Sequence, residues 1–333
     1  MLYTALRRFG ATVLMLLGAV IGTFLLTHVV PSDPAQVAAG LNAPPSEVAH
    51  VRAELGLDKP LIDQLGTFLA QLAHGNFGTS FLTQRNVATD IADYFPATFE
   101  LVLWAIAIMV VVGVPIGVYS AIGRHRTAAA VVKIASFGGM GVPAFVTALV
   151  LQIVFFGVLG WFPSGGRISG AAPAPVTHMY TVDALLTGNW AALGSAVYHI
   201  ILPAASLAVY RVGMVARYTE SEVRRIMAAE YVKTARAKGA SMRRILVRHV
   251  ARNAMMPVIA IVGLEFGWLL GGSVLVETIF SWPGMGDYID NSVTAFDFSP
   301  VIISTLTLAA AFAVINLIVD LIQGLLDPRV REA

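Results

Sequence analysis

Long apolar stretches dominate this sequence and restrict what it can fold into. A helix that crosses a bilayer needs roughly 20 mostly apolar residues. Six stretches meet this requirement, at about Phe9–Val30, Thr98–Ile122, Val131–Leu159, Ala196–Tyr218, Ala254–Val276 and Pro300–Leu326. Only 13% of the residues are charged, against about 25% in an average soluble domain. We therefore predict an all-α integral membrane protein with six transmembrane helices.

The first apolar stretch follows two arginines, as the core of a signal peptide does. Its apolar run is too long for a signal peptide, and no small-residue cleavage site follows before Pro31. We interpret it as a transmembrane helix that stays in the protein.

The positive charges predict the orientation of the spans, because Lys and Arg concentrate in cytoplasmic loops. With the N-terminus inside, the inside segments hold Arg7, Arg8, Arg124, Arg126, Lys133, nearly all of the basic residues from Arg217 to Arg252, Arg329 and Arg331. The outside segments hold only Arg52, Lys59, Arg85 and Arg167. We expect both the N- and the C-terminus to be cytoplasmic.

These spans divide the chain into residues 1–30, an N-terminal transmembrane helix; residues 31–97, a helical extracytoplasmic segment; and residues 98–333, a core with five transmembrane helices. In the extracytoplasmic segment, we expect Ser46 to cap a helix that runs through Leu55. Pro60 suits the first turn of a second helix, which Gly75 ends. The segment is either a solvated cap or a docking surface for an external partner.

The inside loop of about residues 219–253 is strongly basic. Its pattern predicts a helix that ends near Lys238, a left-handed Gly239, and a second helix capped by Ser241. In that second helix, apolar residues recur at helical spacing and form one stripe. The stripe consists of Met242, Ile245, Leu246, His249 and Val250. Either anionic lipid headgroups or a groove on a partner protein would cover it.

Small residues and prolines mark three of the spans. Gly263, Gly267 and Gly271 form one smooth face of the fifth span, which favours close approach of another helix. Pro143 and Pro203 are expected to kink the third and fourth spans.

The sequence carries no signature of catalysis or of nucleotide binding. It has no Cys, no G-x-x-x-x-G-K-[ST] loop, no H-E-x-x-H and no G-x-S-x-G, and its histidines show no ligand spacing. We assign no catalytic, cofactor-binding or metal-binding residues. An intramembrane hydrolase is therefore disfavoured, and so is a self-contained secondary transporter, because the repeated halves with broken helices that it requires are not found.

Residues 230–257, EYVKTARAKGASMRRILVRHVARNAMMP, resemble the cytoplasmic coupling loop of permeases from ABC importers, in the oligopeptide/dipeptide branch. The family's loop signature is Glu-Ala-Ala, three residues, Gly. Lys233, Thr234, Ala235 and Gly239 occupy those places, so the Glu and the first Ala are missing here. The likeness continues through GGSVLVETIFSWPGMG (271–286) and NLIVDLIQGLLDPRVR (316–331).

This resemblance implies a type I ABC importer permease fold in the bacterial cytoplasmic membrane. It implies a heterodimer with a second, similar permease, two cytoplasmic ATPase domains that bind ATP and Mg, and an extracytoplasmic substrate-binding protein. Besides these proteins and membrane lipid no partner is expected, and no nucleic acid. Peptides are the leading substrate class, with nickel chelates, glutathione or haem-like cargo as alternatives. The expected ATPase-coupling residues are Lys233, Thr234, Ala235, Gly239, Met242, Ile245, Leu246 and His249.

Ionisable and polar residues inside the spans are candidates for the substrate path or its gates. They are Glu265, Glu277, Asp320, Asn316 and Arg211; in the family, the outer gate region lies around Glu277 and Asp287. For Asp320 and Arg211, a structural ion pair or hydrogen bond between helices is the alternative. We expect Glu265 to face the bundle interior as a counter-charge for a peptide's ammonium group. A permanent pair with a partner chain, or a protonated carboxyl, remains open.

Overall fold

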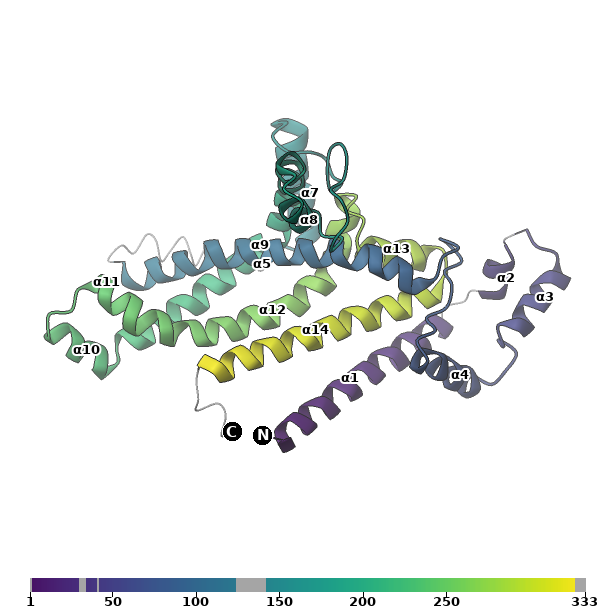
Figure 1. Ribbon diagram of the computed structural model, residues 1–333, viewed down its shortest axis with the longest axis horizontal. Helices are drawn as coiled ribbons and strands as arrows, with labels where there is room; N and C mark the ends of the chain where they lie inside the picture. The colour runs from purple at the N-terminus through teal and green to yellow at the C-terminus, as the bar shows by residue number, and fades with distance from the viewer. Residues whose placement is uncertain (1, 30–33, 41, 124–141, 327–333) are drawn as a thin grey trace. The chain divides into compact units, whose positions relative to one another are not determined.

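The computed structural model describes residues 2–29, 34–40, 42–123 and 142–326 (Figure 1). The regular elements in these residues are helices, apart from an isolated bridge between Thr79 and Asn86. They are α1 (Leu2–Val29), α2 (Pro34–Ala39), α3 (Pro45–Glu54), α4 (Leu61–Ala73), α5 (Val87–Ile122), α7 (Ala144–Gln152), α8 (Tyr180–Leu186), α9 (Trp190–Met227), α10 (Glu230–Ala237), α11 (Met242–Ile245), α12 (Arg252–Ile279), α13 (Met285–Thr294) and α14 (Phe298–Leu326). Two π-helical segments, Ile153–Val158 and Leu246–Ala251, continue α7 and join α11 to α12. The all-α prediction is confirmed for the described residues.

Four of the described helices are long and apolar enough to cross a membrane: α5, α9, α12 and α14. The first and third predicted spans correspond to shorter apolar helical stretches, Thr12–Leu26 and Ala144–Val158. Residues 131–141 of the third predicted span lie outside the described residues. The chain is therefore an all-helical membrane protein with at least four helices of spanning length.

Helix α9 is longer than the span predicted at Ala196–Tyr218. At its start, the Asn189 side chain accepts a hydrogen bond of 3.0 Å from the backbone N–H of Ala192, which caps the first turn. At its end, Arg224 lies one turn from Glu220 and forms an ion pair of 2.9 Å with it. Such pairs stabilise a helix beyond its apolar part, so the helix continues to Met227.

Prolines begin helices here more often than the sequence suggested. The prediction that Ser46 caps α3 was wrong: Pro44 holds the cap position, the helix begins at Pro45, and no side chain caps it. Proline suits a first helical position because its φ is fixed and its missing N–H has no partner there. Pro60 and Pro143 likewise stand at the caps of α4 and α7, so Pro143 does not kink a described helix. Pro203 does lie inside α9.

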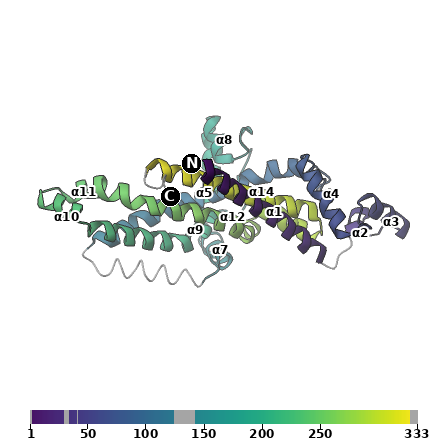
Figure 2. The same cartoon turned by 90° about the horizontal axis from the view of Figure 1, so that it is seen from below.

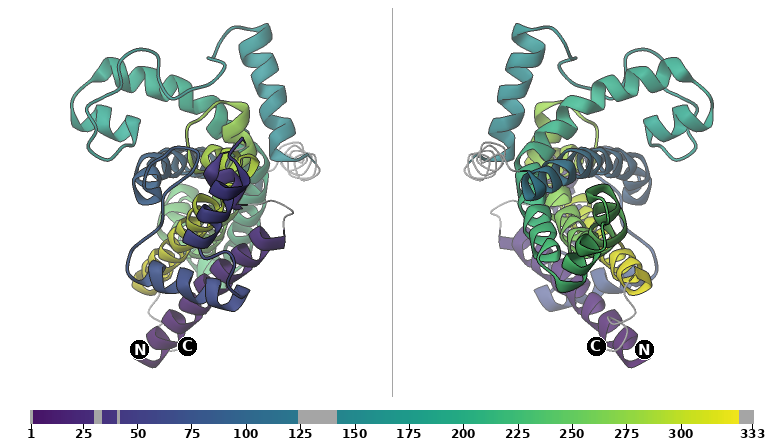
Figure 3. Two further views of the ribbon diagram at one scale, coloured as in Figure 1. Left: turned by 90° about the vertical axis from the view of Figure 1, so that its right-hand side faces the viewer. Right: turned by 90° about the vertical axis from the view of Figure 1, so that its left-hand side faces the viewer.

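The chain divides into two compact units, the first comprising Met1–Ala97 and Pro283–Ala313. In this unit α4 lies beside α1 (Figure 3). Val20 and Phe24 of α1 and Ile302 of α14 are buried together, and Leu65, Phe68, Leu69 and Leu72 of α4 pack against them. The apolar stripe of α4 is therefore covered by the chain itself.

Two buried carboxylates hold α13 within this first unit. Tyr288 donates a hydrogen bond of 2.9 Å to Asp90, and Ser80 donates one of 2.7 Å to Asp297, which follows α13. Burial, together with the acceptor Asp90, holds the pKa of Tyr288 above its ordinary value. The phenol therefore stays protonated and remains a donor at physiological pH.

The second unit comprises Thr98–Trp282 and Val314–Ala333. Within it, α9 and α12 run side by side over much of their length (Figures 1 and 2). Between the end of α9 and the start of α12, α10 and α11 form a hairpin. Helix α7 contacts both α9 and α12. This unit contains the hairpin and the path candidates Arg211, Glu265, Glu277, Asn316 and Asp320, whereas Asp287 lies in the first unit.

Candidate functional site

The α10–α11 hairpin turns at Gly239, as predicted. Gly239 has φ +81°, in the left-handed region that favours glycine, and its N–H donates to the Arg236 carbonyl at 3.0 Å. Ser241 then caps α11, because its hydroxyl accepts from the backbone N–H of Arg244 at 3.4 Å. Both predicted turn signals are confirmed.

The apolar stripe that follows is largely covered by the chain itself. Ile245 and Val250 are buried against Val223 and Ile226 of α9 and Val232 of α10. The π-helical turn that begins at Leu246 explains this pairing: its i→i+5 repeat brings residues five apart onto one face. The predicted stripe is confirmed for Ile245, Leu246, His249 and Val250, which are buried or half-buried, whereas Met242 is exposed. The cover that the structure shows comes from this chain's own α9 and α10.

The expected coupling residues consequently differ in accessibility. Leu246, His249 and Ala235 are half-buried, whereas Lys233 and Thr234 are exposed. Met242 is 44% exposed, and Val247, which lies outside the predicted stripe, is 68% exposed. The surface that the hairpin presents therefore includes Met242 and Val247 but not Ile245.

Glu265 lies inside the bundle, as predicted, but its partner belongs to the same chain. Its Oε2 lies 2.6 Å from Nη1 of Arg211 on α9, and both side chains are largely buried. The expectation of a carboxylate that faces the pathway without a partner in this chain was therefore wrong. No local spacing in the sequence joins a residue of α9 to one of α12, so only the packing of these helices reveals the pair.

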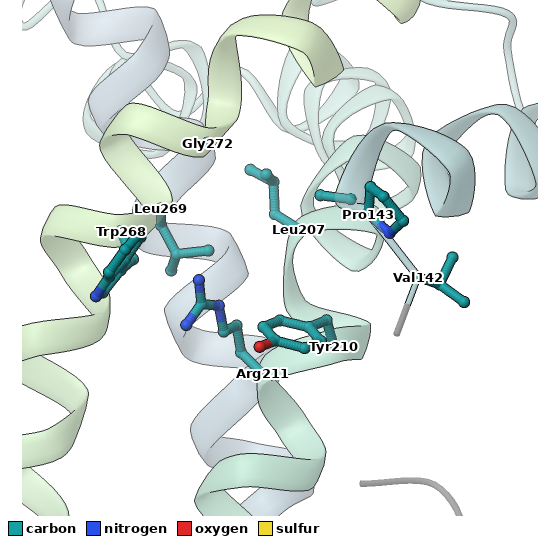
Figure 4. A pocket seen from close by; sticks show the side chains of 9 residues that line it. Val142, Pro143, Leu207, Tyr210, Arg211, Trp268, Leu269 and Gly272 are labelled. Carbon is teal, nitrogen blue, oxygen red and sulfur yellow. The ribbon is translucent and has the colours of Figure 1, made fainter. Parts of the chain in front are cut away.

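A cavity of about 270 Å³ opens beside this ion pair, between α7, α9 and α12. It is lined by Val142, Pro143, Ala144, Leu207, Tyr210, Arg211, Trp268, Leu269 and Gly272. Arg211 extends from α9 toward α12, with Tyr210 beside it and Trp268 opposite (Figure 4). Its guanidinium carbon lies 4.7 Å from the centre of the Tyr210 ring and 5.6 Å from that of Trp268. The cavity lining thus carries one charged group, a guanidinium flanked by two aromatic rings.

A family model described as "binding-protein-dependent transport system inner membrane component" matches residues 113–332. A second model, for the N-terminal part of such membrane components, matches residues 1–102. The chain belongs to this family. It is therefore an inner-membrane component of a transport system that depends on a binding protein.

Curated relatives of this inner-membrane component match it over nearly its whole length. It is 38% identical over 326 residues to the probable D,D-dipeptide transport system permease protein DdpB of Escherichia coli K12. The aligned residues cover 97% of this chain and 96% of the relative. It is 34% identical over 332 residues to the dipeptide transport system permease protein DppB of Alkalihalophilus pseudofirmus, covering 99% and 100%. It is 36% identical over 328 residues to the di/tripeptide transport system permease protein DppB of Pseudomonas aeruginosa, covering 98% of each chain.

The other expected path residues of this inner-membrane component are not among the residues that line the cavity. Asn316 and Asp320 lie one turn apart on α14, both half-buried, and neither lines the cavity. Glu277 is fully buried and accepts a hydrogen bond of 2.9 Å from Thr98. Asp287 lies in the first turn of α13, where burial holds the pKa of its carboxyl above the ordinary value.

Sequence reasoning missed the most enclosed ion pair that the structure describes in this inner-membrane component. Arg167, for which the sequence predicts only a position in an outside segment, donates to Glu100 Oε2 at 2.8 Å. Glu100 also accepts from the backbone N–H of Thr181 at 2.6 Å. Glu100 begins the second apolar stretch, and an acid within such a stretch was the one signal that pointed to it.

The predicted glycine face is used over only part of its length. A Cβ at Gly263 would lie 2.6 Å from a γ-methyl of Val319, so α12 and α14 approach closely there. Gly267 is half-buried. At Gly271 the described residues leave the Cβ position open, with no atom within 4 Å. The prediction of close helix packing is confirmed at Gly263. At Gly271 no described residue of this chain packs closely.

Proposed function

We propose that this chain is the permease subunit of an ATP-driven importer of di- and oligopeptides. The names of its relatives support this substrate class, since they describe permeases for dipeptides, D,D-dipeptides and di- or tripeptides. In this proposal, an external substrate-binding protein delivers the peptide, and a second, similar permease completes the path. The chain has six transmembrane helices with both termini in the cytoplasm.

One observation carries the proposal: a single buried cluster joins the hairpin to the helices that line the cavity. Ile245 and Val250 pack with Val223 and Ile226 of α9, and the hairpin continues without a break into α12. Helices α9 and α12 also carry Arg211 and Trp268 at the cavity. A force applied to α10 or α11 would therefore reach the cavity walls through packed side chains, because a close-packed interior transmits strain.

ATP and Mg belong to separate ATPase chains in this proposal. The sequence has no phosphate-binding G-x-x-x-x-G-K-[ST] loop, so the energy must come from a partner. The docking surface on this chain is the exposed side of the hairpin, with Lys233, Thr234, Met242 and Val247. The basic flanks of the hairpin also suit contact with anionic lipid headgroups. The chain itself performs no catalysis.

The test is uptake by the reconstituted complex. The chain is co-expressed with the second permease, the ATPases and the binding protein of its system, and a labelled dipeptide is offered to proteoliposomes. Uptake is expected only with ATP, and it should stop when the ATPase chains carry inactivating substitutions. Uptake that follows an ion gradient and proceeds without ATP would contradict the proposal, as would a purified chain that retains no ATPase partner.

A further inference from the structure

The cavity between α7, α9 and α12 presents one charge to its interior. Of the nine described residues that line it, Arg211 alone is ionised, and the other lining side chains are aliphatic or aromatic, with the Tyr210 hydroxyl and the Trp268 indole N–H as their polar groups. A buried charge needs a partner, because desolvation is costly. Glu265 supplies that partner at 2.6 Å, but it is not itself part of the lining. The face of the ion pair that a molecule in the cavity meets is therefore the guanidinium.

The guanidinium keeps donors that Glu265 does not use. Arginine has five N–H donors in a rigid fork, and the pair joins Nη1 to one carboxylate oxygen. The described residues supply no second acceptor to the Arg211 side chain. Tyr210 and Trp268 flank its carbon at 4.7 and 5.6 Å, which holds the cation in place without occupying its hydrogen-bonding edge. A planar fork of this kind matches a carboxylate.

We infer that Arg211 binds the C-terminal carboxylate of a short peptide during its passage, an assignment that rests on the proposed function. This reverses the role expected from the sequence, which placed Glu265 opposite the peptide's ammonium group. Glu265 acts here as a positioning residue: it orients the guanidinium and competes with the arriving carboxylate for its donors. That competition keeps the site weak, as a transport path requires, because a bound solute must also leave. A zwitterionic peptide adds no net charge to the pair.

The experiment compares two forms of one dipeptide, with a free C-terminal carboxylate and with a C-terminal amide. The complete complex in proteoliposomes is used throughout, with one binding protein, so that the preference of that protein cancels between variants. The readout is the ratio of the two ATP-dependent uptake rates. Arg211→Gln should lower the preference for the free carboxylate by about tenfold, the value of one charge-assisted hydrogen bond. Arg211→Lys keeps the charge but loses the fork, and should give an intermediate ratio.

Arg211→Gln also leaves Glu265 without its counter-charge, so a second variant separates binding from structure. Arg211→Gln/Glu265→Gln removes both charges and should restore assembly of the complex while the preference stays lost. Arg225→Gln is the matched control: it opens an Arg–Glu pair of the same 2.6 Å length on the same helix, away from the cavity. It should leave the ratio unchanged.

Three results would overturn the inference in an active complex: a double variant with the wild-type ratio, equal losses for both peptide forms in Arg211→Gln, or an altered ratio in Arg225→Gln. The first would mean that Arg211 only neutralises Glu265. A wild-type complex with no ATP-dependent uptake of either form would instead overturn the proposed function, and with it the inference. The two failures are therefore distinguishable.

Discussion

Arg167 donates a hydrogen bond of 2.8 Å to Glu100, and both side chains are more than nine-tenths buried. The Arg167 guanidinium also donates to the His178 carbonyl at 2.9 Å and lies 3.7 Å above the Tyr180 ring. Glu100 belongs to α5, whereas Arg167 lies in the connection that precedes α8. This pair therefore fastens the connection to α5, and its loss should be felt in stability.

Arg167→Met should lower the free energy of unfolding by about 3–5 kcal/mol, because it leaves the Glu100 carboxylate buried without a counter-charge. The measurement is thermal or chemical unfolding of the purified chain. Arg225→Met is the control, since Arg225 forms an exposed pair with Glu222 and should cost about 0–1 kcal/mol. Arg167→Met/Glu100→Gln should recover part of the loss. Similar small shifts in both single variants would contradict a stabilising role for the buried pair.

Gly239→Val should strain the hairpin turn by about 1–3 kcal/mol, because Gly239 has φ +81° and a β-branched residue rarely adopts that conformation. The described residues leave the Cβ position open, so the effect arises from the backbone and not from a clash. ATP hydrolysis in the reconstituted complex should continue while peptide uptake falls.

Gly239→Asn is the matched variant for this turn, since asparagine tolerates the left-handed region far better. It should retain more uptake than Gly239→Val. Equal loss in both variants would mean that side-chain size, and not φ, limits this position.

The sequence predicts the local features of the hairpin well because they depend on neighbouring residues. A glycine in the left-handed region and a serine that accepts from the N–H three residues on are short-range requirements, and Gly239 and Ser241 meet both. The apolar lengths of α5, α9, α12 and α14 are equally local. Such features follow from the bilayer thickness and from the conformational preferences of turn residues, which are the same for every chain.

Features that depend on the packing of distant helices were predicted only in part: an ion pair between helices was the alternative for Arg211, but the sequence did not name Glu265 as its partner. The Arg211–Glu265 pair requires α9 and α12 to lie side by side in one register, and the Arg167–Glu100 pair requires a loop to fold back on α5. The burial of Ile245 by this chain is a further case, because its cover comes from Val223 and Ile226 of α9 and Val232 of α10.

Met242→Asp and Ile245→Asp should have opposite signatures in the complex. Met242 is 44% exposed and Ile245 is 1% exposed. We expect Met242→Asp to weaken co-purification of the ATPase chains with little change in the melting temperature of the permease. Ile245→Asp should lower that melting temperature by burying a charge within the hairpin cluster. If Met242→Asp leaves co-purification intact, the exposed side of the hairpin faces lipid instead.

Single cysteines should report the orientation directly, because the chain has none of its own. Cysteines at Gln71 and Ala172 are expected to react with a membrane-impermeant reagent in intact cells. A cysteine at Ala237, in the exposed part of the hairpin, should react only after the membrane is opened. Labelling of Ala237 from outside would contradict the proposed cytoplasmic position of the hairpin and with it the proposed contact with the ATPases.

Gly263→Ala should destabilise the contact between α12 and α14, whereas Gly271→Ala should not. The added methyl group at Gly263 would lie 2.6 Å from one γ-methyl of Val319 and 3.2 Å from its Cβ. A β-branched side chain has few alternative rotamers in a helix, so the helices must move apart, at a cost of about 1–3 kcal/mol for overpacking. At Gly271 the same methyl group meets no described atom within 4 Å. Alanine also favours a helix over glycine by about 0.8–1 kcal/mol, so Gly271→Ala should be neutral or stabilising in the isolated chain.

Gly263→Ala/Val319→Ala tests the cause, because it removes the methyl groups that clash. Melting temperatures of the purified variants provide the measurement, and a double variant no more stable than Gly263→Ala would show that Val319 is not what limits this position.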